Sequence, residues 1–457
     1  MYNVEAVLTT KARYLVLITA FLGWFFGGVV MSTSALAMRS AAIDLLSRVG
    51  DMDLQQFHRF NTIIQKHNGS RKESPLTTAE QAQLDGWRLS AQTWYAYYQC
   101  AMLFGAAVGG LVFGRMGDRL GRTLGMAGSI LCFSVFSALA YFMQTPMQLL
   151  VMWFLACLGI GGMWPNGVAL VSETWSNMSR PLVAGIMGAS ANVGLFAMAT
   201  LATYIAITPE HWHWTLLVCA VPTVLGIFVL IAVPESPRWL AARNQEIAGG
   251  PANKMQVFRS PLLTTTALGI LLATIPLVGG WGSANWMVPW AGEAGETANP
   301  PNHKLKAQVH QARALPGMVG TFLGGWIAHL FGRRLSFCLC SLGALFCAQW
   351  TFWVLRPTDP SFLIWVGGLG FFSGFYFGWL PLFLPELFPT SVRSTGTGVS
   401  FNFGRFVTAV TVFVTGAITA EFGGDYARIG RVTSLIFLVG AIAIWCAPDT
   451  SKHQLQD

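Results

Sequence analysis

The sequence has few charged residues for its length. Only 11% of its 457 residues are Asp, Glu, Lys or Arg, whereas 53% are apolar and 32 are phenylalanine. So little charge could not cover the surface of a soluble protein of this size. The eight cysteines show no disulfide or metal-ligand spacing, which argues against a disulfide scaffold and a structural metal site.

Motifs for catalysis are also missing from the sequence. It contains no nucleophile triad, metal cluster or nucleotide-binding loop at a recognisable spacing, and His211 and His213 beside Trp212 form no metal site by themselves. We therefore predict that the chain is not an enzyme and binds no cofactor or metal. The net charge of +8 is explained by contact with anionic lipid, and nothing in it indicates a nucleic-acid partner.

Long apolar runs dominate what is present. A helix of about 20 residues spans the roughly 30 Å hydrocarbon layer of a membrane, and twelve stretches reach this length. We expect these spans at 14–38, 92–113, 123–143, 148–171, 182–206, 213–233, 262–288, 311–331, 335–355, 361–384, 395–418 and 430–447. The fold class predicted is all-α integral membrane, with twelve transmembrane helices.

The two halves of the chain resemble each other. Glu173 and Arg180 recur as Glu386 and Arg393 at an offset of 213 residues, and GRMGDRLGR is echoed by GWIAHLFGR at an offset of 211. PESPR is echoed by PDTSK at an offset of 214. Such duplication is typical of transporters built from two pseudo-symmetric six-helix bundles.

The polar segments define the predicted domains. The segment 234–261 separates an N-terminal bundle, 1–233, from a C-terminal bundle, 262–457. Residues 39–91 form a long polar insertion between the first two spans, and their apolar spacing predicts one or two amphipathic helices over the mouth of the bundle. The insertion could act as a lid, or as a passive cap or partner surface.

Basic residues predict the orientation in the membrane. With the N-terminus inside, six basic residues fall in the short outer loops or within three residues of them, and fourteen in the inner segments. The inner ones are Lys11, Arg13, Arg115, Arg119, Arg122, Arg180, Arg238, Arg243, Lys254, Arg259, Arg333, Arg334, Arg393 and Lys452. We therefore expect both termini in the cytoplasm and the chain in a plasma or bacterial inner membrane.

GRMGDRLGRT from Gly114 resembles the loop signature of the major facilitator superfamily, with Asp118, Arg119, Gly121 and Arg122 in place. PESPRWL, PELFPTSVRSTGTG and PDTSK resemble the branch that holds sugar porters, organic-ion transporters and aromatic-acid or sialic-acid symporters. The resemblance covers essentially the whole chain. It implies transport by alternating access, in which the two bundles rock around a central site.

The resemblance also implies a gate of charged residues on the cytoplasmic side. Asp118 is placed to accept hydrogen bonds from a helix N-terminus in the other bundle, while nearby arginines supply the opposite charge. The gate residues expected are Asp118, Arg119, Arg122, Glu173, Arg180, Glu235, Arg238, Glu386 and Arg393. The alternative is that they form ordinary surface ion pairs. His329 and Leu330 replace the Asp and Arg in the second copy, so the gate should be asymmetric.

One charge falls deep inside a span. Arg405 lies about ten residues, or roughly 15 Å, into the eleventh span, and the equivalent position of the other half is Asn192. A buried arginine is costly and usually faces a wet cavity, so a carboxylate on the substrate would be its counter-ion. NFGR also resembles the eleventh helix of organic-anion and acid carriers. Alternatively, Arg405 ties helices together through backbone carbonyls.

Aromatic and amide side chains supply the rest of the predicted site. They could stack on a ring and orient it, although each alone is more often packing or part of an interfacial belt. The substrate-binding residues predicted with Arg405 and Asn192 are Trp24, Gln99, Trp281, Asn285, Tyr376, Trp379 and Asn402. Arg313, expected near an outer helix end, could attract an anion or simply snorkel to the rim.

The first span departs from the acid-symporter pattern. GWFFGGVVM has Gly27 and Val30 where that family often has two aspartates, so proton coupling there is doubtful and His310 is a weak substitute. We predict a monomeric secondary transporter of a small organic anion, such as a monocarboxylate, an aromatic acid or an acidic sugar. The alternatives are a neutral-sugar transporter and a non-transporting membrane sensor with the same fold.

Overall fold

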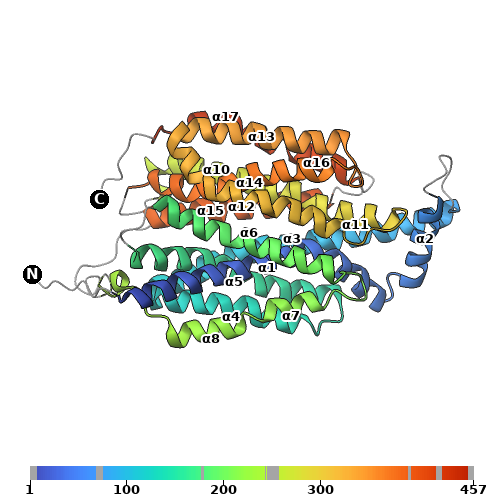
Figure 1. Ribbon diagram of the computed structural model, residues 1–457, viewed down its shortest axis with the longest axis horizontal. Coiled ribbons are helices and arrows are strands. Elements are labelled where there is room, and N and C mark those ends of the chain that lie inside the picture. The colour runs from blue at the N-terminus through green and yellow to red at the C-terminus, as the bar shows by residue number, and fades with distance from the viewer. Residues whose placement is uncertain are drawn as a thin grey trace, which may run out of the picture.

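The computed structural model describes residues 8–67, 76–175, 180–241, 243, 257–389, 393–417 and 425–450. Within these ranges it contains twelve helices long and apolar enough to cross a membrane. The helices lie side by side, and helix α2 sits at one end of the molecule (Figure 1). We call that end the α2 face and the opposite end, where α1 begins and α17 ends, the terminal face.

The first half of the chain supplies six spans. They comprise α1 (Thr10–Arg48), α3 (Thr78–Leu120), α4 (Arg122–Ala140), α5 (Pro146–Thr174), α6 (Arg180–Tyr204) and the pair α7 (Trp214–Ala220) and α8 (Thr223–Ala232), which together form one span. Pro222, which has no backbone N–H to donate, lies at the break between α7 and α8. The short helix α2 (Leu54–His67) connects α1 to α3 outside the bundle.

The second half supplies the other six spans. They comprise α10 (Leu262–Leu277) with η2 (Val278–Ser283), η3 (Ala284–Trp286) and α11 (Met287–Thr297); α12 (Leu305–Phe331); α13 (Arg333–Val354); α14 (Phe362–Glu386); α15 (Arg393–Ala417); and α16 (Tyr426–Thr433) with α17 (Ile436–Ala443) and η5 (Ile444–Cys446). Each half builds its own apolar core, and the core of the first half also takes in a few residues of the second. The sequence prediction of twelve spans in an all-α membrane fold is confirmed.

Close helix packing repeats in the two halves. Helices α3 and α5 form the most extensive helix contact of the first half, and α12 and α14 that of the second. A Cβ atom on Gly109 would overlap the backbone of α5, and one on Gly320, 211 positions later, would overlap the carbonyl of Phe371 in α14. Glycine therefore lets these backbones approach closely, as is common between helices in lipid.

The insertion at 39–91 is shorter than the sequence analysis predicted. Helix α1 continues to Arg48 and α3 begins at Thr78, so much of the expected loop is helix. The prediction was wrong because it treated Arg39 as the end of a span, whereas this side chain is buried and paired with glutamates of the second half. The expected amphipathic helix is present as α2, whose Phe57 and Phe60 pack against α1 and α3.

The span Leu262–Thr297 is not a regular helix. After Pro276 in α10 the chain makes a π-helical turn at η2, followed by the short 3₁₀ turn η3. Proline removes a helical donor, and the glycines of VGGWGS weaken the helix further. Irregular backbone within a membrane is tolerated where protein or a cavity surrounds it, and such turns often mark functional sites.

Substituting the packing glycines should test the close approach of α12 and α14. Gly320→Ala should destabilise the protein by about 1–3 kcal/mol, because the added methyl group overlaps a carbonyl that cannot move away freely. Gly86→Ala is the matched control, because Gly86 lies on an exposed part of α3 with no atom near its Cβ position. The melting temperature in detergent should fall for Gly320→Ala only; an equal effect of both variants would contradict this packing.

Candidate functional site

A cavity of about 590 Å³ lies between the two halves of the chain. Its wall comes from α1, α3, α5 and α6 of the first half, and from α10, η2, α12, α14 and α15 of the second. This volume is in the range of sites that hold small organic ligands. The wall reaches Pro385 and Thr397, close to the ends of α14 and α15 at the terminal face.

The cavity wall is mainly apolar and aromatic. Trp24 of α1 packs against Trp164 of α5 with their ring centroids 5.2 Å apart. Trp281 of η2 contributes to the cavity wall from the second half. The polar side chains in the wall are Asn192, His310, Arg313, Ser373, Thr397, Asn402 and Arg405. A few polar groups in an apolar wall can orient a ligand while the aromatic rings contact its body.

Arg405 projects from α15 into this wall and is 7% exposed. Its Nη1 donates to the carbonyl of Ala106 in α3, at 3.2 Å, and to Oδ1 of Asn402, at 3.4 Å. The guanidinium lies 4.8 Å from the ring centroid of Phe401. Among the described residues no carboxylate lies within ion-pair distance, so the charge is not neutralised by the protein. The sequence analysis offered two alternatives for Arg405, namely a bond to a backbone carbonyl or a charge that awaits a substrate. The structure has features of both, because Arg405 bonds to a carbonyl and yet has no acidic partner among the described residues.

Asn192 and Asn402 are also in the cavity wall, one from each half. Asn192 Nδ2 donates to Oγ1 of Thr321 in α12 at 3.0 Å, and this bond joins the two halves. With Trp24, Trp281 and Arg405, five of the nine predicted substrate-binding residues line the cavity. That they bind substrate stays a prediction.

The other four predicted residues do not line the cavity. Gln99 and Asn285 bond to each other at 3.2 Å within a buried cluster that includes Ser34 and Tyr95. In the core of the second half, Tyr376 bonds to Ser341, and Trp379 donates to a backbone carbonyl. Their position within a span was judged from the sequence, but which face of the helix meets the cavity depends on packing between helices.

Two residues that the sequence analysis set aside are prominent in the wall. Arg313 and His310 lie on one face of α12, one turn apart, and both line the cavity. Placing Arg313 at the membrane rim was wrong, because α12 begins at Leu305 and the residue lies more than two turns inside the helix. The spacing of three residues between a histidine and an arginine on an apolar helix was the signal available in the sequence.

Ion pairs close the space between the halves at the α2 face. Arg39 of α1 contacts Glu293 at 3.5 Å and Glu296 at 3.4 Å, both in α11. Arg88 of α3 contacts Glu293 from the other side at 3.3 Å. Lys306 of α12 donates to Ser40 Oγ at 3.1 Å and to a carbonyl of the first half at 2.6 Å. One half supplies the arginines and the other the glutamates.

The gate residues at the terminal face form a different pattern. Arg122 pairs with Asp118 and, at 3.4 Å, with Glu173, while Glu235 accepts hydrogen bonds from the backbone N–H groups at the start of α4. Asp118, Arg122 and Glu173 belong to the first half, and Glu235 lies in the segment that directly follows it. The expected bond from Asp118 to a helix of the other bundle is not present among the described residues in this conformation, so the latch stays a prediction.

The second half repeats this cluster with one change. Arg333 lies 211 positions after Arg122. It donates two hydrogen bonds to the Glu386 carboxylate, from Nε at 3.2 Å and from Nη2 at 2.9 Å. His329 replaces Asp118, so no aspartate competes for the guanidinium, which agrees with the expected asymmetry.

Four of the predicted gate residues take no part in either cluster as described. Arg119 and Arg238 are exposed, and no hydrogen bond joins their side chains to a described residue. The side chains of Arg180 and Arg393 lie outside the part of the chain that the structure describes. The expected pairs Glu173 with Arg180 and Glu386 with Arg393 are therefore replaced, as far as the described residues go, by pairs with Arg122 and Arg333.

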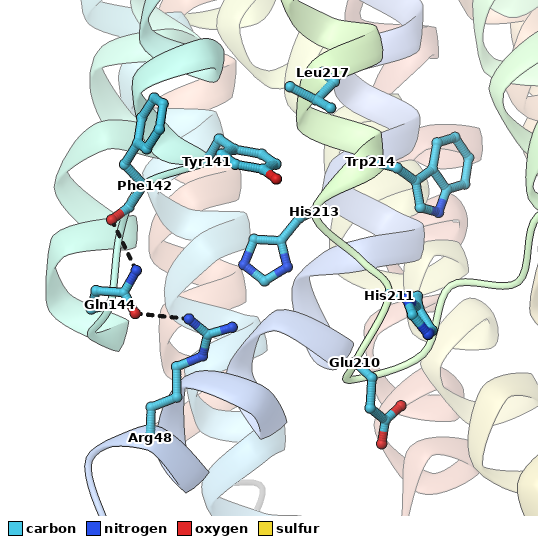
Figure 2. Close-up of a pocket in the computed structure, with 9 residues that line it drawn as sticks. All are labelled: Arg48, Tyr141, Phe142, Gln144, Glu210, His211, His213, Trp214 and Leu217. Atoms are coloured by element: carbon cyan, nitrogen blue, oxygen red, sulfur yellow. Dashed lines mark hydrogen bonds between the residues drawn. The ribbon is translucent and has the colours of Figure 1, made fainter.

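A second depression of about 510 Å³ lies on the surface of the first half at the α2 face. Figure 2 shows Arg48 linked to Gln144, with His213 pointing into the space between them and Trp214. Burial lowers the pKa of His213, and the nearby Asp44 carboxylate acts in the opposite direction. No group of three metal-ligating side chains occurs among the described residues. This depression belongs to one half, whereas a carrier's central site lies between halves.

Comparison with known proteins agrees with this architecture. The profile of the Major Facilitator Superfamily matches residues 82–410. A cis,cis-muconate transport protein of Acinetobacter baylyi is 25% identical over 82% of this chain and 88% of its own length. A gentisate transporter of Corynebacterium glutamicum is 24% identical over 75% of this chain and 76% of its own length.

A solved structure gives the same fold. The xylose transporter of Escherichia coli in an inward-open conformation superposes with a TM-score of 0.62 at 15% identity, covering 97% of this chain and 98% of that one. The likeness at this identity concerns the fold alone. Because the family profile covers most of the sequence, and two homologous halves enclose one cavity, this chain belongs to the Major Facilitator Superfamily and is a membrane transporter, not an enzyme.

Proposed function

We propose that the protein carries a small organic anion across the cell membrane, with Arg405 as the residue that binds the carboxylate. The observation behind this proposal is a buried guanidinium in a ligand-sized cavity with no acidic partner among the described residues. Nη1 is held by Ala106 and Asn402, while Nε and Nη2 have no hydrogen-bond partner among the described residues. A planar fork of this kind suits a carboxylate, and its desolvation cost is repaid only when an anion binds.

The relatives described above support the same substrate class. Two of these relatives are named as transporters of cis,cis-muconate and of gentisate, and both compounds are carboxylates. Xylose, named for the solved structure, is a neutral sugar, and that transporter shares only the fold at 15% identity. A neutral sugar remains the second candidate because the aromatic wall at Trp24, Trp164 and Trp281 would also suit a sugar ring. A carboxylate is favoured because a sugar would leave the positive charge of Arg405 unbalanced.

Transport by alternating access requires each face to open in turn. In this structure the cavity wall extends to the terminal face, while Arg39, Arg88 and Glu293 join the halves at the α2 face. The terminal-face clusters each stay within one half, so they do not hold the halves together here. We infer that this conformation admits substrate from the terminal face, and that breaking the α2-face ion pairs belongs to the opposite stroke.

We further propose that the terminal face is cytoplasmic. Arginines are numerous at the helix ends on this face, for example Arg115, Arg119 and Arg334, and basic residues concentrate on the cytoplasmic side of membrane proteins. The substrate would then leave the cavity toward the cytoplasm during uptake.

Removing the guanidinium should abolish transport. A thermal-shift screen of the purified protein, with gentisate, cis,cis-muconate and xylose included, first identifies a ligand. We expect Arg405→Ala to lose at least about 100-fold in affinity, because each hydrogen bond to a charged group contributes about 1.5–3 kcal/mol. Arg405→Lys should retain part of the binding, since it keeps the charge but not the fork.

Uptake into proteoliposomes measures the same loss. Arg356→Ala, which removes an exposed arginine outside the cavity, is the control for net charge and should transport normally. Normal uptake by Arg405→Ala would disprove the anion proposal, and a thermal shift with xylose alone would favour the sugar.

Weakening the α2-face ion pairs should open that face. Glu293→Gln removes the negative charge that pairs with both Arg39 and Arg88. The conformation that is open at the α2 face should therefore become more populated. Spin labels at the exposed Gln56 and His303, in a variant without native cysteines, report the distance across the face. We expect a second, longer distance in Glu293→Gln. Glu210→Gln breaks a pair with His58 inside the first half and should leave the distribution unchanged; similar effects of both changes would refute the gate.

Sided labelling should establish the topology. Cysteines introduced at Lys11 and Asp51 are exposed at the terminal and α2 faces respectively. In a background without native cysteines, an impermeant thiol reagent added to intact cells should label the cysteine at 51, and the one at 11 only after permeabilisation. The reverse pattern would show that the termini lie outside.

A further inference from the structure

The cavity wall contains a second cation, the half-buried Arg313, on a different helix from Arg405. Arg313 has no hydrogen bond or ion pair to any described residue, and its Nη1 is fully covered and without a partner. The other basic residues on the neighbouring parts of the chain differ in this respect: Arg39 is paired with two glutamates, and Lys306 donates to Ser40 and a carbonyl. An unpaired charge in this environment costs free energy unless a ligand supplies the opposite charge.

Other unsatisfied polar groups surround Arg313. His310, one turn away on α12, is 2% exposed, and both of its ring nitrogens lack a hydrogen-bond partner. Ser373 of α14 is 7% exposed with a hydroxyl that also has none, and it lines the same cavity. Buried polar groups nearly always find partners, so three such side chains on one stretch of wall indicate a binding site.

The backbone around these groups leaves room for a ligand. Gly280 of η2 lines the cavity and has no atom within 4 Å of its Cβ position. Gly370 and Gly374 flank Ser373 and let α14 pack directly on α12 beside Arg313. The cavity is therefore open at Gly280, and the glycines of α14 hold Ser373 close to the part of α12 that carries Arg313.

The two cations lie at different depths. Arg405 is 12 residues from the start of α15 at the terminal face, whereas Arg313 is 18 residues from the end of α12 at that face. At 1.5 Å per residue, Arg313 is about 9 Å farther from the terminal face than Arg405. A ligand with one carboxylate can neutralise only one of them.

We propose that His310, Arg313 and Ser373 form a second anion subsite, and that the preferred substrate is a dicarboxylate whose two ends bind Arg405 and Arg313. This inference rests on the proposed function and narrows its substrate class. A dianion would balance both positive charges in a wall where the described residues include no acid, whereas a monoanion would leave one buried charge uncompensated.

Binding of matched probes tests this subsite. Thermal shift and competition binding on the purified full chain would compare the dicarboxylates succinate, adipate and suberate with the monocarboxylates butyrate, hexanoate and octanoate. We expect at least one dicarboxylate to bind at least about 10-fold more tightly than the monocarboxylate of equal carbon number. Equal affinities within every pair would overturn the second subsite while leaving the proposed anion function intact. If no carboxylate binds, both proposals fail.

Variants identify the residue responsible. Arg313→Gln should bring the dicarboxylate and monocarboxylate affinities within about 3-fold of each other, while Arg405→Gln should weaken both classes. Arg313→Lys should restore part of the preference, because it keeps the charge. Arg356→Gln, outside the cavity, controls for net charge and should not change the ratio. An unchanged ratio in Arg313→Gln would overturn the proposal.

Stability of the ligand-free variant gives an independent measurement. Because Arg313 has no partner to lose, Arg313→Gln should melt at the same temperature as the wild type or at a higher one. A marked fall in melting temperature would show that Arg313 supports the fold, and would overturn its assignment to a subsite.

Discussion

The structure depends on positive charges that face a cavity between the two halves, where the described residues supply no acid to neutralise them. Arg405 and Arg313 face one cavity from different helices of the second half, and the described residues offer neither of them a carboxylate. Such an arrangement is unfavourable for the empty protein, since a buried charge loses its hydration. In the proposed function it becomes favourable when a negatively charged ligand enters, and the unfavourable energy of the empty state would then favour anions over neutral ligands.

The two ends of the molecule are held by different kinds of contact. At the α2 face the arginines come from the first half and the glutamates from the second, so each pair links the halves. At the terminal face, Arg122 with Glu173 and Arg333 with Glu386 each fasten helices within one half. A rocking motion requires that each half stays rigid while the contacts between the halves can break. The ion pairs inside each half can persist through the motion, whereas those between the halves break and form again.

The internal duplication explains why the same ion pairs and packing glycines occur in both halves. Arg122 and Arg333 occupy equivalent positions, as do Gly109 and Gly320, and each pair serves the same purpose in its half. The halves differ where the central site needs them to differ. Asn192 stands at the position that corresponds to Arg405, so the duplicated framework carries one strong charge at this depth instead of two. This asymmetry within a duplicated framework places both arginines of the cavity wall in the second half.

The sequence by itself determined the class, the twelve spans, the two halves and the presence of Arg405 deep in the membrane. These follow from local quantities, namely the apolar length needed to cross lipid and the repetition of short motifs. Only the tertiary structure decided which face of each helix meets the cavity, because that depends on how helices rotate and pack against one another. It placed Tyr376 and Trp379 in a core and brought Arg313 and His310 into the wall. It also decided that Arg39 pairs with Glu293, since residues 254 positions apart in the chain meet only when the two halves close.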